Sequence, residues 1–179
     1  MDSDGYLSQL AGIFDGITVL TPSISAIIAI VLAGVLLLAS GFASASEIAF
    51  FSLSPSDRND IDERNHPSDE KISALLGDSE RLLATILITN NFVNVTIIML
   101  CNFFFMNVFI FHSPLAEFLI LTVILTFLLL LFGEIMPKIY SAQKTLAFCR
   151  FSAPGIYYLE NLKSATIIQY TIKGRFMSR

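Results

Sequence analysis

Three long apolar stretches of this chain carry polar residues whose chemistry is that of a cation site. They are Ser40, Ser44, Ser46 and Glu47 in the first stretch, Asn90, Asn91 and Asn94 in the second, and Gly133, Glu134 and Pro137 in the third. Polar groups at bilayer depth are costly and therefore mark a functional site. Oxygen donors suit magnesium, calcium or sodium, whereas zinc or copper would call for a thiolate or histidine cluster.

The third stretch predicts half of such a site. Pro137 has no backbone N–H, so the carbonyl of Gly133, four residues earlier, loses its α-helical partner. A carbonyl freed at membrane depth must be satisfied by protein, water or an ion. Glu134 lies next to it, and we expect a helix break at Pro137 that exposes both oxygens. The alternative is a proline kink with an interfacial pair between Glu134 and Lys138, which have the i, i+4 spacing.

The asparagines of the second stretch fall on two helical faces. Asn90 and Asn94 are four residues apart and share a face, whereas Asn91 points about a third of a turn away. Asparagine also holds membrane helices together through interhelical hydrogen bonds. We prefer that interpretation for Asn91 and ion contact for Asn90 and Asn94.

In the first stretch Ser40, Ser44 and Glu47 follow i, i+4, i+7 and line one face, while Ser46 lies elsewhere. Serine in a membrane helix often donates to its own backbone carbonyl, which is the alternative to ion binding. An ionised Glu47 near the bilayer needs a partner or a watery cavity. If it opens to the cytoplasm with Glu134, the two carboxylates would form an acidic vestibule that concentrates cations.

The elements that position these residues follow from composition. The chain has 179 residues, 54% of them hydrophobic and 15% charged, whereas soluble domains carry about a quarter charged residues. Apart from His112, no charge falls within 23–46, 82–116 or 118–133. A membrane helix needs about 20 apolar residues, so we predict spans at roughly 23–52, 80–106 and 116–136. The fold class is an all-α membrane protein.

All 11 Lys and Arg residues lie between spans one and two, at the very start of span two (Arg81) or after span three. Basic residues mark the cytoplasmic side, which predicts the N-terminus outside and the C-terminus in the cytoplasm. The acidic start at Met1–Asp4 does not resemble a signal peptide. Two cysteines make no disulfide framework, so we expect Cys101 and Cys149 to be buried free thiols.

The predicted organisation has three parts. Residues 1–22 form an extracytoplasmic arm, in which 6–17 make an amphipathic helix on the outer surface or a partly ordered tail. Residues 23–139 form the three-span domain, with a cytoplasmic helical hairpin at 54–79. Residues 140–179 form juxtamembrane amphipathic helices, because the apolar run 145–159 is interrupted by Arg150 and Pro154 and is too short to cross. A final helix leaves the membrane.

Three motifs resemble the CNNM/CorC family. Phe42–Ala49 resembles its FFSGSETA-type stretch, Thr85–Asn94 is similar to its TILIGNNLVN segment, and Phe132–Lys138 is similar to its FGEILPK segment. Their order and spacing agree, and the resemblance covers roughly 20–175. It also touches a gliding-motility-associated branch of bacterial relatives.

The resemblance implies a homodimeric magnesium transporter in the bacterial inner membrane that exports Mg²⁺, with Na⁺ entry as the coupled step. The family's ion site maps onto Ser44, Asn90, Asn94, Gly133 and Glu134, with Ser46 and Asn91 as further candidates. Glu47 is a further candidate because of its carboxylate near the bilayer rather than because of the resemblance. Ala43 and Ala45 stand where the family has serine or glycine, which leaves the choice of serine open. Family members continue into a CBS nucleotide-binding module, so we expect a longer protein in which ATP acts only through that module.

Two competing functions remain open. A membrane anchor or scaffold would use the same polar residues only to hold helices and a dimer together, and a sodium-only site would use the same oxygens. No nucleophile–base pair and no phosphate-binding loop is present in the sequence, so we expect neither an enzyme nor a nucleic-acid partner.

Overall fold

The structure, a computed structural model, describes residues 17–177, with side chains placed for 18–115 and 117–161. Three of its helices are long and apolar enough to cross a membrane, which confirms the predicted all-α membrane fold with three spans. The spans are α2 (Ile24–Phe51), α5 (Ser79–Val108) and the helix Leu119–Gln143, which comprises η1 (Leu119–Ile124), α7 (Leu125–Leu130), η2 (Leu131–Ile135) and α8 (Met136–Gln143).

A pair of short helices follows the first span. α3 (Pro55–Asp62) begins with a capping box: Ser54 Oγ accepts from the backbone N–H of Asp57 at 3.1 Å, and Asp57 Oδ2 accepts from the N–H of Ser54 at 2.9 Å. The proline at the first helical position removes a donor that would have no partner there. α4 (Asp69–Leu76) ends at Gly77. Local sequence signals therefore set both ends of this hairpin.

A buried ion pair ties the hairpin to α9 (Thr145–Met177). Asp69 is fully buried, and its carboxylate accepts from Nε and Nη2 of Arg150 at 2.8 and 3.0 Å. Burial alone would raise the pKa of Asp69, but the hydrogen bonds from Arg150 and from the backbone N–H of His66 outweigh it and hold the pKa below 3.8. The pair links segments more than seventy residues apart in the chain.

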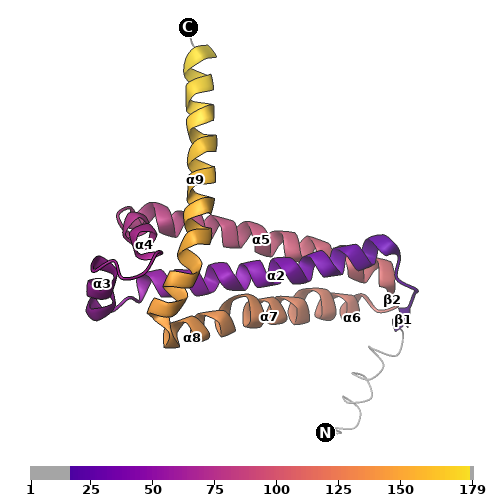
Figure 1. Cartoon of the computed structure of the whole chain (residues 1–179). Helices are drawn as coiled ribbons and strands as arrows, with labels where there is room; N and C mark the ends of the chain where they lie inside the picture. The colour runs from indigo at the N-terminus through magenta and orange to yellow at the C-terminus, as the bar shows by residue number, and fades with distance from the viewer. Residues whose placement is uncertain (1–16, 178–179) are drawn as a thin grey trace. The chain divides into compact units, whose positions relative to one another are not determined.

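One helix replaces the two pieces expected after the third span. α9 runs without interruption through Pro154, and Figure 1 draws it as one ribbon. The proline removes one backbone hydrogen bond, yet residues on both sides of it are buried in one core. Cys149, Ala153 and Ile156 are at most 2% exposed, and this continuous packing favours one uninterrupted helix over a break.

Two short strands were not expected in an all-α chain. β1 (Ile17–Val19) pairs antiparallel with β2 (Phe109–Phe111), with Ile17 opposite Phe111 and Val19 opposite Phe109. β-Branched and aromatic residues favour this extended pairing. Ile17 was predicted to end the amphipathic arm and lies in the strand instead; the rest of that predicted helix lies outside the described residues. After β2 the short α6 (Pro114–Phe118) leads into η1.

The chain divides into two compact units, each with its own core. The first comprises the chain as far as Gly41 together with Asn91–Met136, and the second comprises Phe42–Asn90 together with Pro137–Arg179. The first core contains Ala33, Ile97, Cys101 and Leu129. The second is built by the hairpin and the start of α9 around Phe50, Ile61, Ile72, Leu75, Leu82, Cys149, Ala153 and Ile156.

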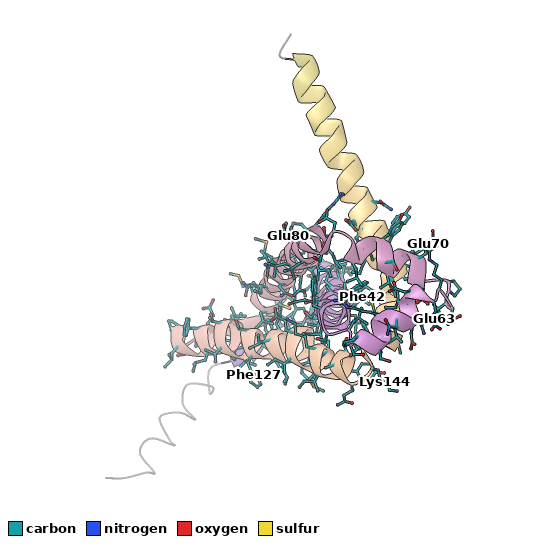
Figure 2. The ribbon with its side chains drawn as sticks, turned by 90° about the vertical axis from the view of Figure 1, so that its left-hand side faces the viewer. Phe42, Glu63, Glu70, Glu80, Phe127 and Lys144 are labelled. Atoms are coloured by element: carbon teal, nitrogen blue, oxygen red, sulfur yellow. The ribbon has the colours of Figure 1, made fainter. Side chains whose placement is uncertain are left out.

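The exposed side chains differ between spans and hairpin. Phe127, on α7, is 60% exposed, whereas Glu63 and Glu70 are exposed on the hairpin (Figure 2). Large apolar side chains without a protein neighbour suit a lipid surface, and exposed carboxylates suit water. Each surface therefore matches the medium that the sequence predicts for it.

Candidate cation site

Polar side chains from three spans meet inside the first unit. Ser40 of α2 donates a hydrogen bond from its hydroxyl to Asn94 Oδ1, with an Oγ–Oδ1 distance of 2.6 Å. Asn94 of α5 in turn donates from Nδ2 to Oε1 of Glu134 in η2 at 3.1 Å. Ser40 is fully buried and Asn94 is 8% exposed, while Glu134 is half-buried. The three form one hydrogen-bonded chain, which we call the Ser40–Asn94–Glu134 cluster.

Gly133 allows the close approach that this cluster requires. A Cβ added at Gly133 would lie 3.2 Å from Ser40 Oγ and 3.3 Å from Leu37 Cδ1, closer than ordinary contacts. Small residues of this kind let the backbones of neighbouring membrane helices approach each other closely. The glycine therefore has a structural role in bringing η2 against α2, beside the role predicted for its carbonyl.

The helix does not break at Pro137. α8 begins at Met136 and continues to Gln143, and the wide π-turn of η2 precedes the proline. Met136 N–H donates to the carbonyl of Leu131, five residues earlier, as in a π-helix. The widened turn changes the hydrogen-bond spacing where the proline N–H is missing, so the helix continues. Gly133 O still lacks an N–H from residue 137.

A second polar contact lies within the second unit. Asn90 Nδ2 donates to Ser44 Oγ at 3.1 Å, and both side chains are buried. Ser46 instead donates to the backbone carbonyl of Phe42 at 2.7 Å, which is the alternative that the sequence left open for serines. The five predicted ligands thus fall into two groups, with Asn94, Gly133 and Glu134 in the first unit. That all five hold one ion stays a prediction.

Glu47 and Asn91 are placed differently from these groups. Glu47 Oε2 pairs with Nζ of Lys138 at 3.1 Å, so the lysine considered as a partner of Glu134 meets Glu47. The carboxylate of Glu47 therefore already has a compensating charge. Asn91 is exposed on α5. The acidic vestibule predicted from Glu47 and Glu134 stays a prediction.

Two buried polar residues, Ser40 and Ser141, were missing from the predicted ligand set. Ser40 was placed on the face of Ser44 but not assigned as a ligand, although the position one turn from Ser44 was the signal that could have found it. Ser141 of α8 donates to the carbonyl of Ala45 at 2.6 Å and is fully buried. No motif in the sequence marked Ser141, because its partner is a backbone oxygen nearly a hundred residues away.

The donor set of the first unit suits a hard cation. It offers a hydroxyl, an amide oxygen, a carboxylate and, at Gly133, a backbone carbonyl. Within the described part of the chain, no group of three or more His, Cys, Asp or Glu side chains is placed to hold a metal. A cation there would therefore be held by mixed oxygen ligands, as magnesium and sodium sites are.

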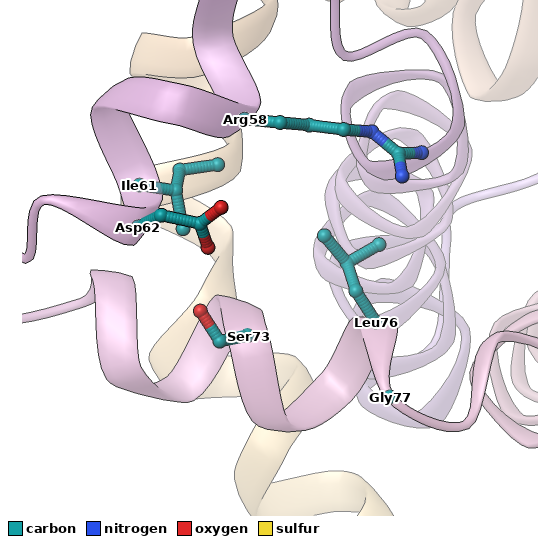
Figure 3. Close-up of a pocket in the computed structure, with 6 residues that line it drawn as sticks. All are labelled: Arg58, Ile61, Asp62, Ser73, Leu76 and Gly77. Carbon is teal, nitrogen blue, oxygen red and sulfur yellow. The ribbon is translucent and has the colours of Figure 1, made fainter. Parts of the chain in front are cut away.

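A cavity of about 270 Å³ in the hairpin has a different character. Its walls include Arg58 and Asp62 of α3 and Ser73 of α4, and the Arg58 side chain extends toward Leu76 (Figure 3). One guanidinium and one carboxylate line this cavity, so its walls carry no net charge. This cavity therefore does not fit the oxygen-only chemistry of a cation site.

Comparison with known protein families shows which family the chain belongs to. The family model described as the cyclin M transmembrane N-terminal domain, CNNM, matches residues 17–168. No individually curated protein matches the chain significantly. The matched range contains all three spans, the hairpin and both polar groups. The chain therefore belongs to the cyclin M transmembrane-domain family, and it is a multi-pass membrane domain related to ion transport.

Proposed function

We propose that this domain binds Mg²⁺ at the Ser40–Asn94–Glu134 cluster and moves it across the membrane. The observation that supports the proposal most directly is the position of Asn94, which contacts Ser40 on one side and Glu134 on the other. Oxygen atoms from three spans therefore lie around one amide. A half-buried carboxylate beside them supplies the negative charge that a divalent cation needs.

The cluster retains oxygen lone pairs for an ion. Asn94 Oδ1 has two lone pairs and uses one for Ser40, and Glu134 accepts from Asn94 through Oε1 alone. Gly133 O has no N–H partner at Pro137. Mg²⁺ gives up water reluctantly and keeps several waters in most protein sites. These oxygens would therefore replace only part of its hydration shell, and Ser44 and Asn90 remain predicted ligands by resemblance.

The direction of transport and the assembly are further parts of the proposal. The resemblance implies efflux of Mg²⁺ with Na⁺ entry by a homodimer. The distribution of the 11 basic residues supports a cytoplasmic C-terminus. Asn91 supports an interface, because an exposed amide on a span has no favourable contact with lipid and would gain a partner in a second copy.

One observation favours the scaffold function instead. Among the described residues, every buried side-chain nitrogen and oxygen has a hydrogen-bond partner. Polar residues that only join helices would also be fully paired. A test must therefore remove the charge of the cluster and keep its hydrogen bond.

Glu134→Gln meets that requirement, because the amide oxygen of the new side chain still accepts from Asn94 Nδ2. We would measure Mg²⁺ flux into or out of proteoliposomes containing the full chain with a fluorescent Mg²⁺ indicator. Transport predicts that Glu134→Gln and Asn94→Ala abolish the flux while the protein stays folded. The scaffold function predicts unchanged behaviour for Glu134→Gln.

Asn107→Ala is the matched control for Asn94→Ala. Asn107 also lies on α5, but its side chain donates only to the carbonyl of Phe103, four residues earlier. It should leave the flux unchanged. Thermal unfolding in Mg²⁺ and in Na⁺ at equal ionic strength then separates the two ions, since a bound ligand stabilises the folded protein. Stabilisation by Na⁺ alone would indicate the sodium-only site.

A further inference from the structure

A second cavity lies in the first unit, beside the N-terminal end of span three. It has a volume of about 380 Å³ and lies between α5 and the segment formed by α6 and η1. Its walls are mostly apolar, with Met106 and Leu121 among them. Three polar side chains also face it: Asn102, Glu117 and Thr122.

These three side chains have no protein partner. Within the part of the chain that the structure describes, no hydrogen bond or ion pair joins the side chain of Asn102, Glu117 or Thr122 to another group. Asn102 and Glu117 are half-buried, and Thr122 is exposed. The cavity is open, so water or a hydrated ion can reach all three polar groups. The cavity is large enough to hold several waters, at about 30 Å³ each.

The three polar side chains come from different elements. Glu117 belongs to α6, Thr122 to η1 and Asn102 to α5. Two segments that are separate in the sequence therefore bring a carboxylate, a hydroxyl and an amide to the walls of one cavity.

The charge of this cavity is unbalanced. Glu117 contributes a carboxylate, and neither Lys nor Arg is among the residues that line the walls. A carboxylate beside low-dielectric walls concentrates cations. The other two groups add an amide and a hydroxyl oxygen, so all the ligands are hard donors suited to a hydrated divalent cation rather than to a soft metal.

We propose that Asn102, Glu117 and Thr122 form a second, weaker binding site for a hydrated divalent cation. Glu117 in α6 and Glu134 in η2 are 17 residues apart in continuous helix, roughly 25 Å at the rise of an α-helix. The site is therefore separate from the Ser40–Asn94–Glu134 cluster. It would hold the ion with most of its waters retained, and its existence does not depend on the function proposed for that cluster.

Manganese binding to the purified full chain tests the proposal. Free Mn²⁺ gives an electron paramagnetic resonance signal that is lost on binding, so a titration counts sites and ranks their affinity. We expect two classes of site in the unaltered chain. Glu117→Gln should weaken the weaker class by at least about fivefold, since one unit charge is removed from a partly exposed site. Glu134→Gln should affect only the tighter class.

Glu70→Gln is the control, because it removes the same charge from an exposed position on the hairpin. If the Glu117→Gln and Glu70→Gln titrations coincide, the proposal is wrong. Thr122→Val keeps the side-chain shape and provides a second variant, for which we expect a weakening of about threefold from one lost neutral ligand.

A spin label locates the ion. Leu115 is exposed close to Glu117 in the sequence, so a nitroxide on Leu115→Cys should be broadened by bound Mn²⁺, and the broadening should disappear with Glu117→Gln. Mg²⁺ should reverse the broadening, whereas Na⁺ at equal ionic strength should not. Equal reversal by Na⁺ would show only general screening and would overturn the divalent site.

Discussion

Asn94 donates from Nδ2 to Oε1 of Glu134 at 3.1 Å, and this contact fixes the orientation of the amide. An ionised carboxylate can only accept hydrogen bonds, so the NH₂ group of Asn94 must face it. The amide oxygen consequently faces Ser40, whose hydroxyl donates to it. The carboxylate thus determines which atom of Asn94 faces the first span.

The serines of the first span should differ in their contribution to the stability of the folded protein. Ser40→Ala removes the donor to Asn94 and should lower the free energy of unfolding by about 1 kcal/mol, a usual value for an interhelical hydrogen bond in a membrane. We also expect it to weaken Mg²⁺ stabilisation of the protein. Ser46→Ala is the control, since that hydroxyl bonds only within its own helix. Equal shifts in thermal unfolding for the two variants would contradict the assignment.

Gly133→Ala should disturb the cluster by overpacking. The added methyl would press on Ser40 Oγ and Leu37 Cδ1 and should cost about 1–3 kcal/mol of stability, with a loss of Mg²⁺ flux. Combining Gly133→Ala with Ser40→Ala removes Ser40 Oγ, one of the two atoms that the added methyl would press on. The double variant should therefore recover part of the thermal stability without recovering flux. A double variant less stable than either single one would exclude this explanation.

The Asp69–Arg150 pair should dominate the stability of the second unit. Asp69→Asn leaves the half-buried guanidinium of Arg150 without its charge partner, and breaking a buried pair in this way costs about 3 kcal/mol. Arg81→Met is the comparison, because Arg81 is 46% exposed in its pair with Glu160. That variant should change stability by less than about 1 kcal/mol. Chemical denaturation of both measures the difference.

The same pair predicts a pH dependence. The pKa of Asp69 is lowered in the folded state from its ordinary value of 3.8. The stabilisation is therefore fully present above that value and is lost as the pH falls through the lowered pKa. Thermal unfolding measured from pH 7 down to pH 3 should show a decline that Asp69→Asn reduces. An identical decline in both proteins would mean that other carboxylates are responsible.

Cys149 should be unreactive in the folded protein. Burial raises the pKa of its thiol to about 12, with the nearby Asp69 carboxylate adding to the effect. Almost no thiolate is then present at pH 8, and the side chain is fully buried. Maleimide labelling should therefore become rapid only after unfolding. Glu70→Cys, at an exposed position, is the positive control and should react at once.

Much of the fold followed from local patterns in the sequence. The three spans could be predicted because lipid requires long uncharged helices, and the hairpin helices could be predicted because Ser54, Pro55 and Gly77 act within their own turns. The continuity of α9 through Pro154 could not be predicted, since the proline favours a break and only the packing of Cys149 and Ile156 opposes it. Long-range packing prevailed over local preference there.

The candidate site shows the same division between features that local sequence patterns predict and features that only long-range contacts determine. Residue types and spacing named Asn94 and Glu134 as candidates, and the structure brings these two side chains into contact. The sequence did not show that Lys138 meets Glu47. They also led us to expect a break at Pro137, because proline is usually judged against an α-helix and the π-turn of η2 provides another way to accommodate it. Ser40 and Ser141 depend on partners that only the folded chain identifies.

The uninterrupted α9 has a mechanical consequence. Its 33 residues make a rod about 50 Å long, and the Asp69–Arg150 pair fastens the hairpin near one end. A small tilt at that fastening would be magnified along the rod, as a lever magnifies a movement near its pivot. A domain joined to the far end would thus be swung by movements too small to disturb the packing where they start.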